Sequence, residues 1–491
     1  MPSDFTAQLP LNVFQPGAYS AVNASLLASP NLLVGKPIPM VLGTALGGKP
    51  DTPLYFGSPS LLSSVLRGGV AYDVARFCFD GGASQVGVTR VGNSVTQGTL
   101  TLAGTAGIVA TLTSKDYGTW VNSIMVSVAA GPIITLTYTD TLGNLYLETW
   151  NLTGVGTITG AVVAAAINGG LYGFNASNFV TAAAGVGTVP MTVVSNAPLT
   201  GGTDGLIPVT GDWTNGLAAI ETEPIDIVLV ATGTASIHAQ ALTHCQNMSA
   251  PAARHERVLV CGGVLGESVT TVIARMPSLA SARAELVYPG MYDFNAAGAL
   301  TEYDPFYVAG KIAGMWSAAT DPATSLIHQS VPIVQAEVNL STAQGGALDQ
   351  LLQAGVTPIA PQPGGGYWVV DALTGYDLPD GTFRDMVKTR SADYVAQYAR
   401  AQLEQQFVGA KNLLSSQSSI QQAALNICDT LSTQQIIEQY LTPIVNAGPT
   451  RNSWMVGLPV MLIDTNKFIF ITVGLQPSST LAGSTTTQDL G

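Results

Sequence analysis

Four histidines and one glycine-rich loop are the features of this chain that come nearest to a chemical site. His238 and His244 lie six positions apart in a segment with a helical pattern, whereas two zinc ligands on one helix face need a spacing of four. The loop 261–268 (CGGVLGES) lies between a strand-like run and a helix-like run, where a phosphate could bind. It matches neither G-x-G-x-x-G nor the Walker A pattern, and it has no lysine to meet a phosphate. We therefore interpret the histidines as structural and the loop as a tight turn.

Serine, carboxylate and cysteine patterns do not form a catalytic set either. There is no G-x-S-x-G sequence, and Ser84 and Ser236 lack its flanking glycines. Glu221 and Glu223 are more typical of a solvated helix end than of an acid/base pair. The cysteines are far apart and have no metal-ligand spacing, which predicts buried, reduced side chains; they are Cys78, Cys245, Cys261 and Cys428. We predict no catalytic residues, no cofactor and no metal, and therefore no enzyme.

Charged residues make up only 10% of the 491 residues, against about 25% in typical soluble domains. So few charges indicate either a stable extracellular β-rich protein with a neutral surface, or an assembly subunit whose surface is covered by partners. The formal net charge of −13 argues against nucleic acid as a partner, because phosphate binding requires a basic surface. Residues 1–375 hold 11 basic and 22 acidic residues and residues 376–491 hold 7 and 9, so the C-terminal part is the least acidic.

Targeting signals are not evident in the sequence. The first ten residues, MPSDFTAQLP, lack the basic and apolar regions of a secretory signal. The longest apolar runs fall far short of the roughly 20 residues that span a bilayer. We therefore expect no direct membrane insertion, and a protein that is made and kept in the cytoplasm unless another machine exports it.

Strand-like runs and helical patterns alternate over 31–92 and again over 206–374. Strand-like runs lie at 37–45 and 85–92, and apolar runs typical of buried parallel strands lie at 225–231, 257–263 and 284–290. Helical patterns lie between or after them, at 58–82, 235–248, 268–276 and 304–319. In the last of these, Gly310 and Gly314 are four apart, which allows close helix packing. This order predicts one central α/β domain that is split by an insertion.

The predicted insertion, 93–205, has its own composition. Residues 93–203 contain only four charged side chains, and Thr, Val, Gly and Ala alternate as in half-buried strands, at 99–113, 124–130 and 134–150. Leu142-Gly143-Asn144 predicts a hairpin turn within the last run, and a short alanine-rich helix is expected at 160–167. We therefore predict an inserted β-rich outer domain.

Residues 375–476 predict a C-terminal α+β domain. A long helical pattern over 381–408 is followed by a second helix, and the spacing of Ser432 and Gln435 predicts a further helical turn or two. The second helix has an apolar stripe, made of Ile420, Ala424, Ile427 and Leu431. Two apolar runs, 454–463 and 467–473, read as a hairpin without partner strands nearby in the sequence. We predict that other copies of the chain supply those partners.

The two ends of the chain have different patterns. Residues 1–30 are apolar without a helical period, which favours an extended arm, with a disordered leader as the alternative. Residues 477–491 are polar and predict a flexible tail.

Several short segments, taken in order, resemble the contractile tail sheath proteins of phages and related injection systems. They are PGAY (16–19), VARFCFDGGASQVGVTRV (74–91), YGTWVNSIMVSV (117–128), LTGGTDG (199–205), YPG (288–290), YDPFYVAGKIAGMWSA (303–318) and RDMVKTRSADYVAQYARAQLEQQFVG (384–409). Each segment is short and unspecific, and their order along nearly the whole chain carries the resemblance.

The resemblance implies a structural protein rather than an enzyme. Its central α/β layer would be similar to a subtilisin-like fold without a working catalytic triad. Subunits would form hexameric rings that stack helically around an inner tail tube and contract to drive the tube into a target cell. Further partners would be baseplate and tail terminator proteins, in a virion tail assembled in the host cytoplasm. The alternative is a receptor- or glycan-binding phage structural protein that acts through the 93–205 β domain.

The resemblance also implies roles for particular residues. A donated N-terminal arm would span residues 5–19 and include Phe5, Leu9 and Val13, and a donated C-terminal strand would consist of Lys467, Phe468, Ile469, Phe470, Ile471 and the two residues that follow. Lys388, Arg390 and Arg400 would face an acidic tube surface and make weak, releasable contacts. The alternative for these three cations is an ordinary solvated helix face.

Overall fold

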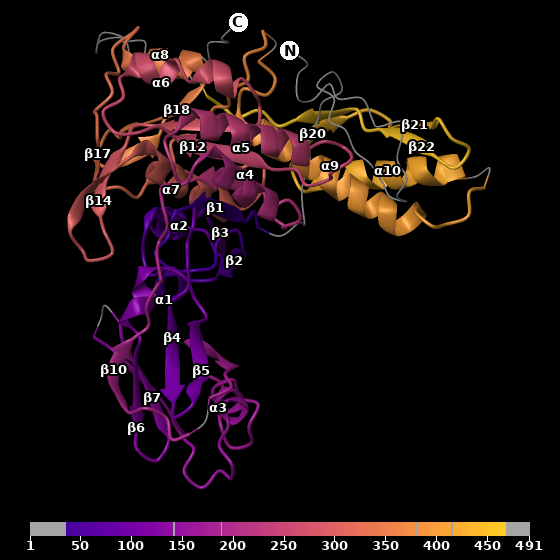
Figure 1. Cartoon of the computed structure of the whole chain (residues 1–491). Coiled ribbons are helices and arrows are strands. Elements are labelled where there is room, and N and C mark those ends of the chain that lie inside the picture. Colours follow the sequence, from indigo (N-terminus) through magenta and orange to yellow (C-terminus); the bar gives the residue numbers. More distant parts are fainter. Residues whose placement is uncertain (1–35, 141–142, 188, 380, 414–415, 468–491) are drawn as a thin grey trace, which may run out of the picture.

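A computed structural model describes residues 36–140, 143–187, 189–379, 381–413 and 416–467. Figure 1 shows a central α/β layer, an elongated β-rich part below it, and a helical and β part that extends to one side. The protein is thus a mixed α/β protein, as predicted.

The central layer is built on a nine-stranded sheet with the order β16-β19-β18-β13-β12-β11-β1-β3-β2. The strands are β1 (Pro39–Gly43), β2 (Pro53–Phe56), β3 (Val86–Arg90), β11 (Ile227–Val230), β12 (Val258–Gly262), β13 (Ala284–Tyr288), β16 (Ser330–Val331), β18 (Val356–Pro361) and β19 (Tyr367–Val369). The six strands from β18 to β3 are parallel. At the edges, β2 is antiparallel to β3, β19 is antiparallel to β18, and β16 is antiparallel to β19. β1 pairs with both β3 and β11, so segments from before and after residues 93–205 form one continuous sheet.

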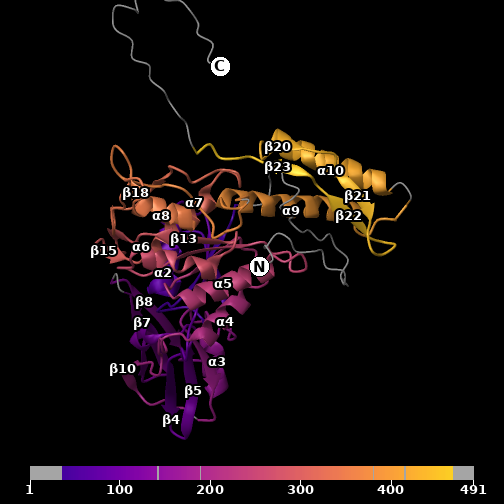
Figure 2. The ribbon, with the colours of Figure 1, turned by 90° about the horizontal axis from the view of Figure 1, so that it is seen from above.

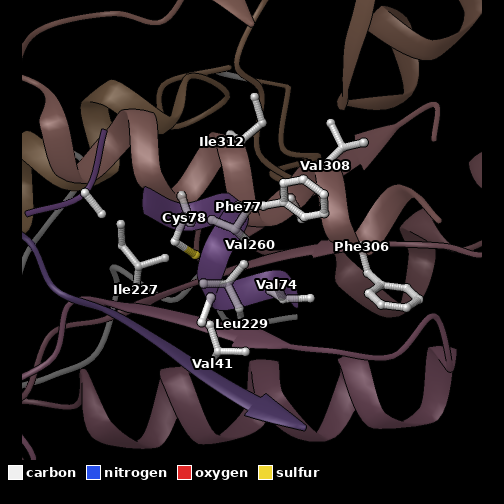
Figure 3. Packing of buried hydrophobic residues seen from close by; sticks show 14 of the residues in the cluster. Val41, Val74, Phe77, Cys78, Ile227, Leu229, Val260, Phe306, Val308 and Ile312 are labelled. Carbon is white, nitrogen blue, oxygen red and sulfur yellow. The ribbon is translucent and has the colours of Figure 1, made fainter. Parts of the chain in front are cut away.

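Helices cover both faces of this sheet because alternate strand residues point to opposite sides. Val41 and Leu229 pack beneath α1 (Pro59–Leu66), α2 (Val70–Asp80) and α7 (Pro305–Ala318), whereas Leu42 and Val228 pack on the other side. The helices of that other side are α4 (Thr210–Ala219), α5 (Ala235–Met248), α6 (Val269–Ile273) and α8 (Ala347–Ala354). Figure 3 shows Phe77 of α2 and Ile312 of α7 within the first of these cores. Continuous apolar strands are required here because both faces of the sheet are buried.

Two features of the α2–α7 side depend on glycine. A Cβ atom on Gly314 would lie 2.1 Å from the carbonyl oxygen of Cys78, so the predicted close packing of α7 is confirmed. The predicted single helix over 58–82 is wrong, because the chain breaks between α1 and α2. Arg67, Gly68 and Gly69 have φ angles of 62°, 135° and 100°, which a helix cannot contain.

The inserted part contains a three-stranded sheet, β4-β5-β9, and a four-stranded sheet, β10-β6-β7-β8. The strands are β4 (Thr99–Gly104), β5 (Gly107–Ser114), β6 (Met125–Ala129), β7 (Ile133–Thr139), β8 (Leu145–Asn151), β9 (Val180–Ala184) and β10 (Val194–Pro198). Helix α3 (Gly160–Ile167) matches its predicted bounds, and Thr159 caps it through its side chain. The two sheets and α3 share a hydrophobic core of their own, around residues such as Leu136 and Trp150.

The chain enters and leaves the inserted part along two adjacent segments, which we call the neck (93–99 and 200–206). Isolated bridges pair Asn93 with Leu206, Thr96 with Thr203, and Thr99 with Thr200. At the top of the neck, Arg90 pairs with Asp204 at 3.4 Å and donates to the carbonyl oxygen of Gly48. The two crossings are therefore held to each other and to the central sheet.

A third small sheet, β15-β14-β17, lies at the side of the central layer opposite the C-terminal part (Figure 1). Its strands are β14 (Met291–Phe294), β15 (Leu300–Tyr303) and β17 (Gln335–Ala336). Over the residues that the structure describes, no helix has the length and apolar character needed to cross a membrane.

The C-terminal part consists of α9 (Met386–Phe407), α10 (Ser416–Thr433) and four short strands. In Figure 2, α9 runs out from the central layer and α10 lies beside it. The strands are β20 (Ile437–Tyr440), β21 (Ile444–Ala447), β22 (Trp454–Gly457) and β23 (Val460–Leu462). Both helices were predicted, and the buried face of α10 is the predicted apolar stripe.

Two predictions for this part are wrong. The further helical turn expected from the spacing of Ser432 and Gln435 is absent, because α10 ends at Thr433 and the chain turns into β20. The apolar run 454–463 is split at Leu458-Pro459, and it has partners in its own chain: β22 pairs with β21, and β23 with β20. Sequence analysis missed β20 and β21 because Pro443 interrupts the run that contains them.

Candidate assembly interface

Four charged residues of α9 face the central layer and alternate in sign: Arg390, Asp393, Arg400 and Glu404. Their spacings of three, seven and four place them on one side of a helix. Arg390 contacts α7, and Asp393 pairs with a residue that directly precedes β13. Arg400 and Glu404 pair with charged residues of the segment 254–257. We call this set of contacts the ionic seam.

The best-defined contact of the ionic seam joins Asp393 to Arg283. Both terminal nitrogens of Arg283 donate to the carboxylate, each at 2.7 Å, in a bidentate pair. The exposed fractions of the two side chains are only 4% and 9%. Burial raises the pKa of Asp393, while the Arg283 charge acts in the opposite direction. The pair therefore fixes the rotation of α9 at a point that water scarcely reaches.

Arg390 is held at one end of the ionic seam by Trp316 of α7. Its guanidinium lies 4.6 Å from the indole centroid and donates to the Trp316 carbonyl oxygen at 3.0 Å. The Trp316 indole N–H donates to Glu285 at 2.7 Å, and the Thr357 hydroxyl donates to the other oxygen of this carboxylate at 2.9 Å. Burial raises the pKa of Glu285 to about 7 and lowers the pKa of Arg390 to about 10. A fully enclosed carboxyl thus lies under the base of α9.

At the other end of the ionic seam, Arg400 pairs with Glu256, and Glu404 pairs with Arg254. Arg400 also donates to the carbonyl oxygen of Arg254 at 3.1 Å. The Arg400 and Glu256 side chains are 9% and 4% exposed. Contacts of alternating sign therefore continue along α9 until it leaves the central layer.

This geometry changes the prediction for the three cations. Arg390 and Arg400 lie inside the subunit rather than on an exposed helix face, because each satisfies buried oxygens of the central layer. Lys388 is 19% exposed and pairs with Asp464. A tube contact therefore stays a prediction for Lys388 alone. Sequence analysis missed the acidic partners, although the alternation of base and acid at 390, 393, 400 and 404 was visible.

Of the predicted inter-subunit strand residues, only Lys467 lies among the described residues. Its ammonium group donates to Asp371 at 2.6 Å and to Asp385, which precedes α9, at 2.5 Å. Lys467 therefore ties the end of the C-terminal part to the base of α9. Phe5, Leu9, Val13, Phe468, Ile469, Phe470 and Ile471 lie outside the described residues, and their roles stay predictions.

Strands β20 to β23 form one long antiparallel ribbon, which packs one face on α10. Ile437 and Val460 are buried against Leu431 of α10. The opposite face of the ribbon and its bend are apolar but exposed, with exposed fractions of 74% for Leu441, 53% for Ile444, 46% for Met455 and 47% for Met461. A two-stranded ribbon also leaves one edge of each strand without a partner strand in the described part of the chain. Such an edge is a template for a further strand.

The residues first considered for catalysis have structural surroundings. The Nε2 atom of His238 lies 2.7 Å from the Thr232 carbonyl oxygen, and His244 contacts Arg257. Burial lowers the pKa of both imidazoles to about 4. Glu223 accepts a 2.5 Å hydrogen bond from the Tyr55 hydroxyl. Within the described ranges, no group of three or more His, Cys, Asp or Glu side chains could hold a metal ion.

The loop 261–268 and the cysteines also have structural surroundings. The loop forms the turn from β12 to α6, where Glu267 pairs with Arg275. All four cysteines are buried and free, and burial raises the pKa of each thiol.

Residues 208–374 match the family described as the phage tail sheath protein central domain. This segment of the chain is therefore similar to a tail sheath domain. It supplies β11, β12, β13, β16, β18 and β19 of the central sheet and all the acceptors and donors that meet α9 in the ionic seam.

The similarity to known sheath proteins extends beyond residues 208–374. A stretch of 250 residues is 30% identical to the tail sheath protein of Bacillus phage SP01, and it covers 49% of this chain and 42% of that protein. The chain thus spans less than half the length of this curated relative. The sheath tail protein of Listeria innocua has the same fold, with a TM-score of 0.65 at 15% identity over 88% of this chain and 94% of that one. The contracted helical sheath of the anti-feeding prophage gives a TM-score of 0.54 at 13% identity, over 95% and 100% of the two chains.

Proposed function

We propose that this protein is a structural subunit of a contractile tail sheath, which polymerises as stacked rings around an inner tube. The match of residues 208–374 to the sheath central domain carries this proposal. A sheath-like fold over most of the chain supports it. Contraction of the assembled sheath would drive the tube through the envelope of the target cell, and the subunit itself would perform no catalysis.

In this proposal each part of the chain has a mechanical task. The central α/β domain (31–92 and 206–374), with a subtilisin-like arrangement, forms the body of the subunit, and residues 93–205 form an outer domain. Residues 375–476 form the assembly domain, with residues 1–30 as an arm and residues 477–491 as a flexible tail. The ionic seam would transmit force between the assembly domain and the body, because the buried bidentate pair of Arg283 and Asp393 resists sliding of α9.

Strand addition would link the subunits into a mesh. The open edges and exposed apolar face of the β20–β23 ribbon favour an added strand from a neighbouring subunit, because main-chain hydrogen bonds and alternate side chains would then be satisfied. The donors would be the arm at residues 5–19 and the strand that begins at Lys467. A ribbon of two strands is marginally stable alone, so such partners would also complete its fold.

The partners in this proposal are copies of the same chain, in hexameric rings, together with the tube, baseplate and tail terminator proteins. Nucleic acid is not among them, given the net charge of −13. The assembled protein would form part of a virion tail that is put together in the host cytoplasm.

Electron microscopy of the purified full-length chain tests the proposal. We expect hollow cylinders or stacked rings to form without added partners. Small discrete particles at high protein concentration, under several salt conditions, would contradict the sheath role.

A receptor- or glycan-binding role for the inserted part is the second candidate. It is supported by apolar side chains exposed on the edge strand β8, with exposed fractions of 66% for Leu145, 43% for Tyr146 and 62% for Leu147. Because Leu206 N donates to Asn93 O at 2.8 Å, residues 94–205 can be replaced by a short glycine linker. A sheath subunit should still assemble after this deletion, whereas a binding protein would lose its function.

A further inference from the structure

The C-terminal part has opposite charges at its two ends. Between Glu404 and Asp429, and again between Glu438 and Asp464, the sequence contains no Asp or Glu. The charged residues of these two intervals are Lys411 and Arg451, both basic. Two of the flanking carboxylates, Glu438 and Asp464, lie together at the end of the ribbon that meets the central layer.

Lys411 and Arg451 lie together at the outer end, which we call the basic tip (410–413 and 448–454). The Asn412 side chain donates to the Arg451 carbonyl oxygen at 2.9 Å, and the Trp454 indole N–H donates to Asn412 at 3.3 Å. Both cations are exposed. Among the described residues, neither of them has a carboxylate within salt-bridge distance. The first turn of α10 begins beside the tip and adds the positive end of a helix dipole.

An acidic groove lies at the inner end of the ribbon, between β20, the segment after β23 and the loop after α7. Its volume is about 660 Å³, and its lining includes Asp321, Ile437, Glu438, Ile463 and Asp464. The lining thus combines two isoleucines with three carboxylates. Asp464 pairs with Lys388, whereas Glu438 is exposed without a salt-bridge partner in the described part of the chain. The groove is therefore suited to an occupant that is both cationic and compact.

The tip and the groove of one subunit cannot meet. The ribbon between them is about ten residues long, or roughly 30 Å at the rise of a β-strand. It is paired along its length and packed on α10, so it cannot fold back. Figure 1 shows β21 and β22 at the outer end, with β20 toward the central layer.

We propose that the basic tip of one subunit docks in the acidic groove of the next. This contact is heterologous, and repeated heterologous contacts generate rings or open helices. The inference rests on the proposed sheath function and specifies one contact within that assembly. It differs from strand addition because it uses side-chain charge at the ends of the ribbon rather than its edges.

Charge reversal in two complementary variants tests this contact. The first variant carries Lys411→Glu and Arg451→Glu at the tip, and the second carries Glu438→Lys and Asn466→Lys in the groove, where both positions are exposed. We expect each variant alone to need about a tenfold higher concentration to form pelletable assemblies, since two exposed pairs are lost and repulsion is added. An equimolar mixture should recover assembly, because the acidic tip of the first variant then meets the two introduced lysines and the native tip of the second variant meets an unaltered groove. Lys36→Glu with Lys49→Glu is the control for net charge, as both lysines are exposed on the body.

A cysteine pair separates the docking inference from the sheath function. Arg451→Cys and Glu438→Cys in one chain should give chains cross-linked in series on oxidation, since the four native cysteines are buried. Normal assembly of both charge variants, with no cross-link, would overturn the docking contact and leave the sheath function standing. Failure of the unmodified chain to assemble would instead count against the sheath function. Assembly of the variants only with an added basic partner protein would show that the groove serves a different molecule.

Discussion

Asp393→Ala is the substitution that tests the ionic seam most directly. It removes one half of a buried bidentate pair and leaves the Arg283 guanidinium without its counter-charge. Loss of one member of a buried pair typically costs about 3–5 kcal/mol, because the remaining charge is still desolvated. The penalty should fall on the attachment of α9, since Arg283 belongs to the central layer and Asp393 to the helix.

Hydrogen exchange followed by mass spectrometry can localise this penalty. Peptides within 386–407 should lose protection by roughly two to three orders of magnitude in Asp393→Ala, because each tenfold change corresponds to about 1.4 kcal/mol. Peptides of α3, which lies in the separate core of the inserted part, should be unchanged. Asp377→Ala is the matched control, as it removes an exposed carboxylate shortly before α9 that lines neither the ionic seam nor the acidic groove.

The double variant Arg283→Met with Asp393→Leu completes the test. It removes both charges, so most of the lost protection should return, as replacing a buried pair by apolar side chains is often neutral. An effect of Asp393→Ala no larger than that of Asp377→Ala would refute the view that the ionic seam holds α9 in place. A double variant as damaged as the single one would show that packing, rather than charge, is responsible.

Three further predictions concern other parts of the chain. The pKa of the Glu285 carboxyl is raised from 4.5 to about 7, so this group binds a proton more tightly in the folded than in the unfolded protein. Its contribution to the free energy of unfolding is therefore full below pH 4.5 and is lost as the pH rises through 7. In urea unfolding, the wild type should lose about 3 kcal/mol of stability over this pH range relative to Glu285→Gln. Gly314→Ala should lower the melting temperature by several degrees, because its Cβ would overlap the Cys78 carbonyl, whereas Gly211→Ala in α4 meets no atom within 4 Å and should not lower it. Ile444→Ser on the exposed ribbon face should leave urea stability of the dispersed chain within about 0.5 kcal/mol but slow its assembly, as measured by light scattering.

The central sheet could be predicted because its signals are local. In the run IDIVLVA at 225–231 every residue except Asp226 is apolar, and such continuous apolar runs are typical of strands that are buried on both faces of a sheet. The helix α3 was equally accessible, because an alanine-rich run interrupts an alternating β pattern. The break between α1 and α2 depends on positive φ angles at Arg67 to Gly69, and the sequence pattern there suggested one continuous helix instead.

The candidate interface could be predicted only in part, because its contacts are long-range. A basic residue on a helix is usually solvated, and nothing near Arg390 or Arg400 in the sequence reveals that their surroundings come from residues 254–316. The ribbon was half predicted, because its second strand is apolar while the first is interrupted by Pro443 and rich in polar residues. Pairing of these halves depends on tertiary packing against α10 rather than on either strand alone.

The neck has a consequence for how chains of this type can diversify. Entry and exit are bridged neighbours from Asn93 and Leu206 to Thr99 and Thr200, and Arg90 fixes them to the sheet. The segment between the two halves of the neck can therefore be lengthened, shortened or exchanged without changing the distance between the central-sheet segments that precede and follow it. The neck is thus a natural graft site, at which residues 94–205 could be exchanged for another domain while the geometry of the central sheet stays constant.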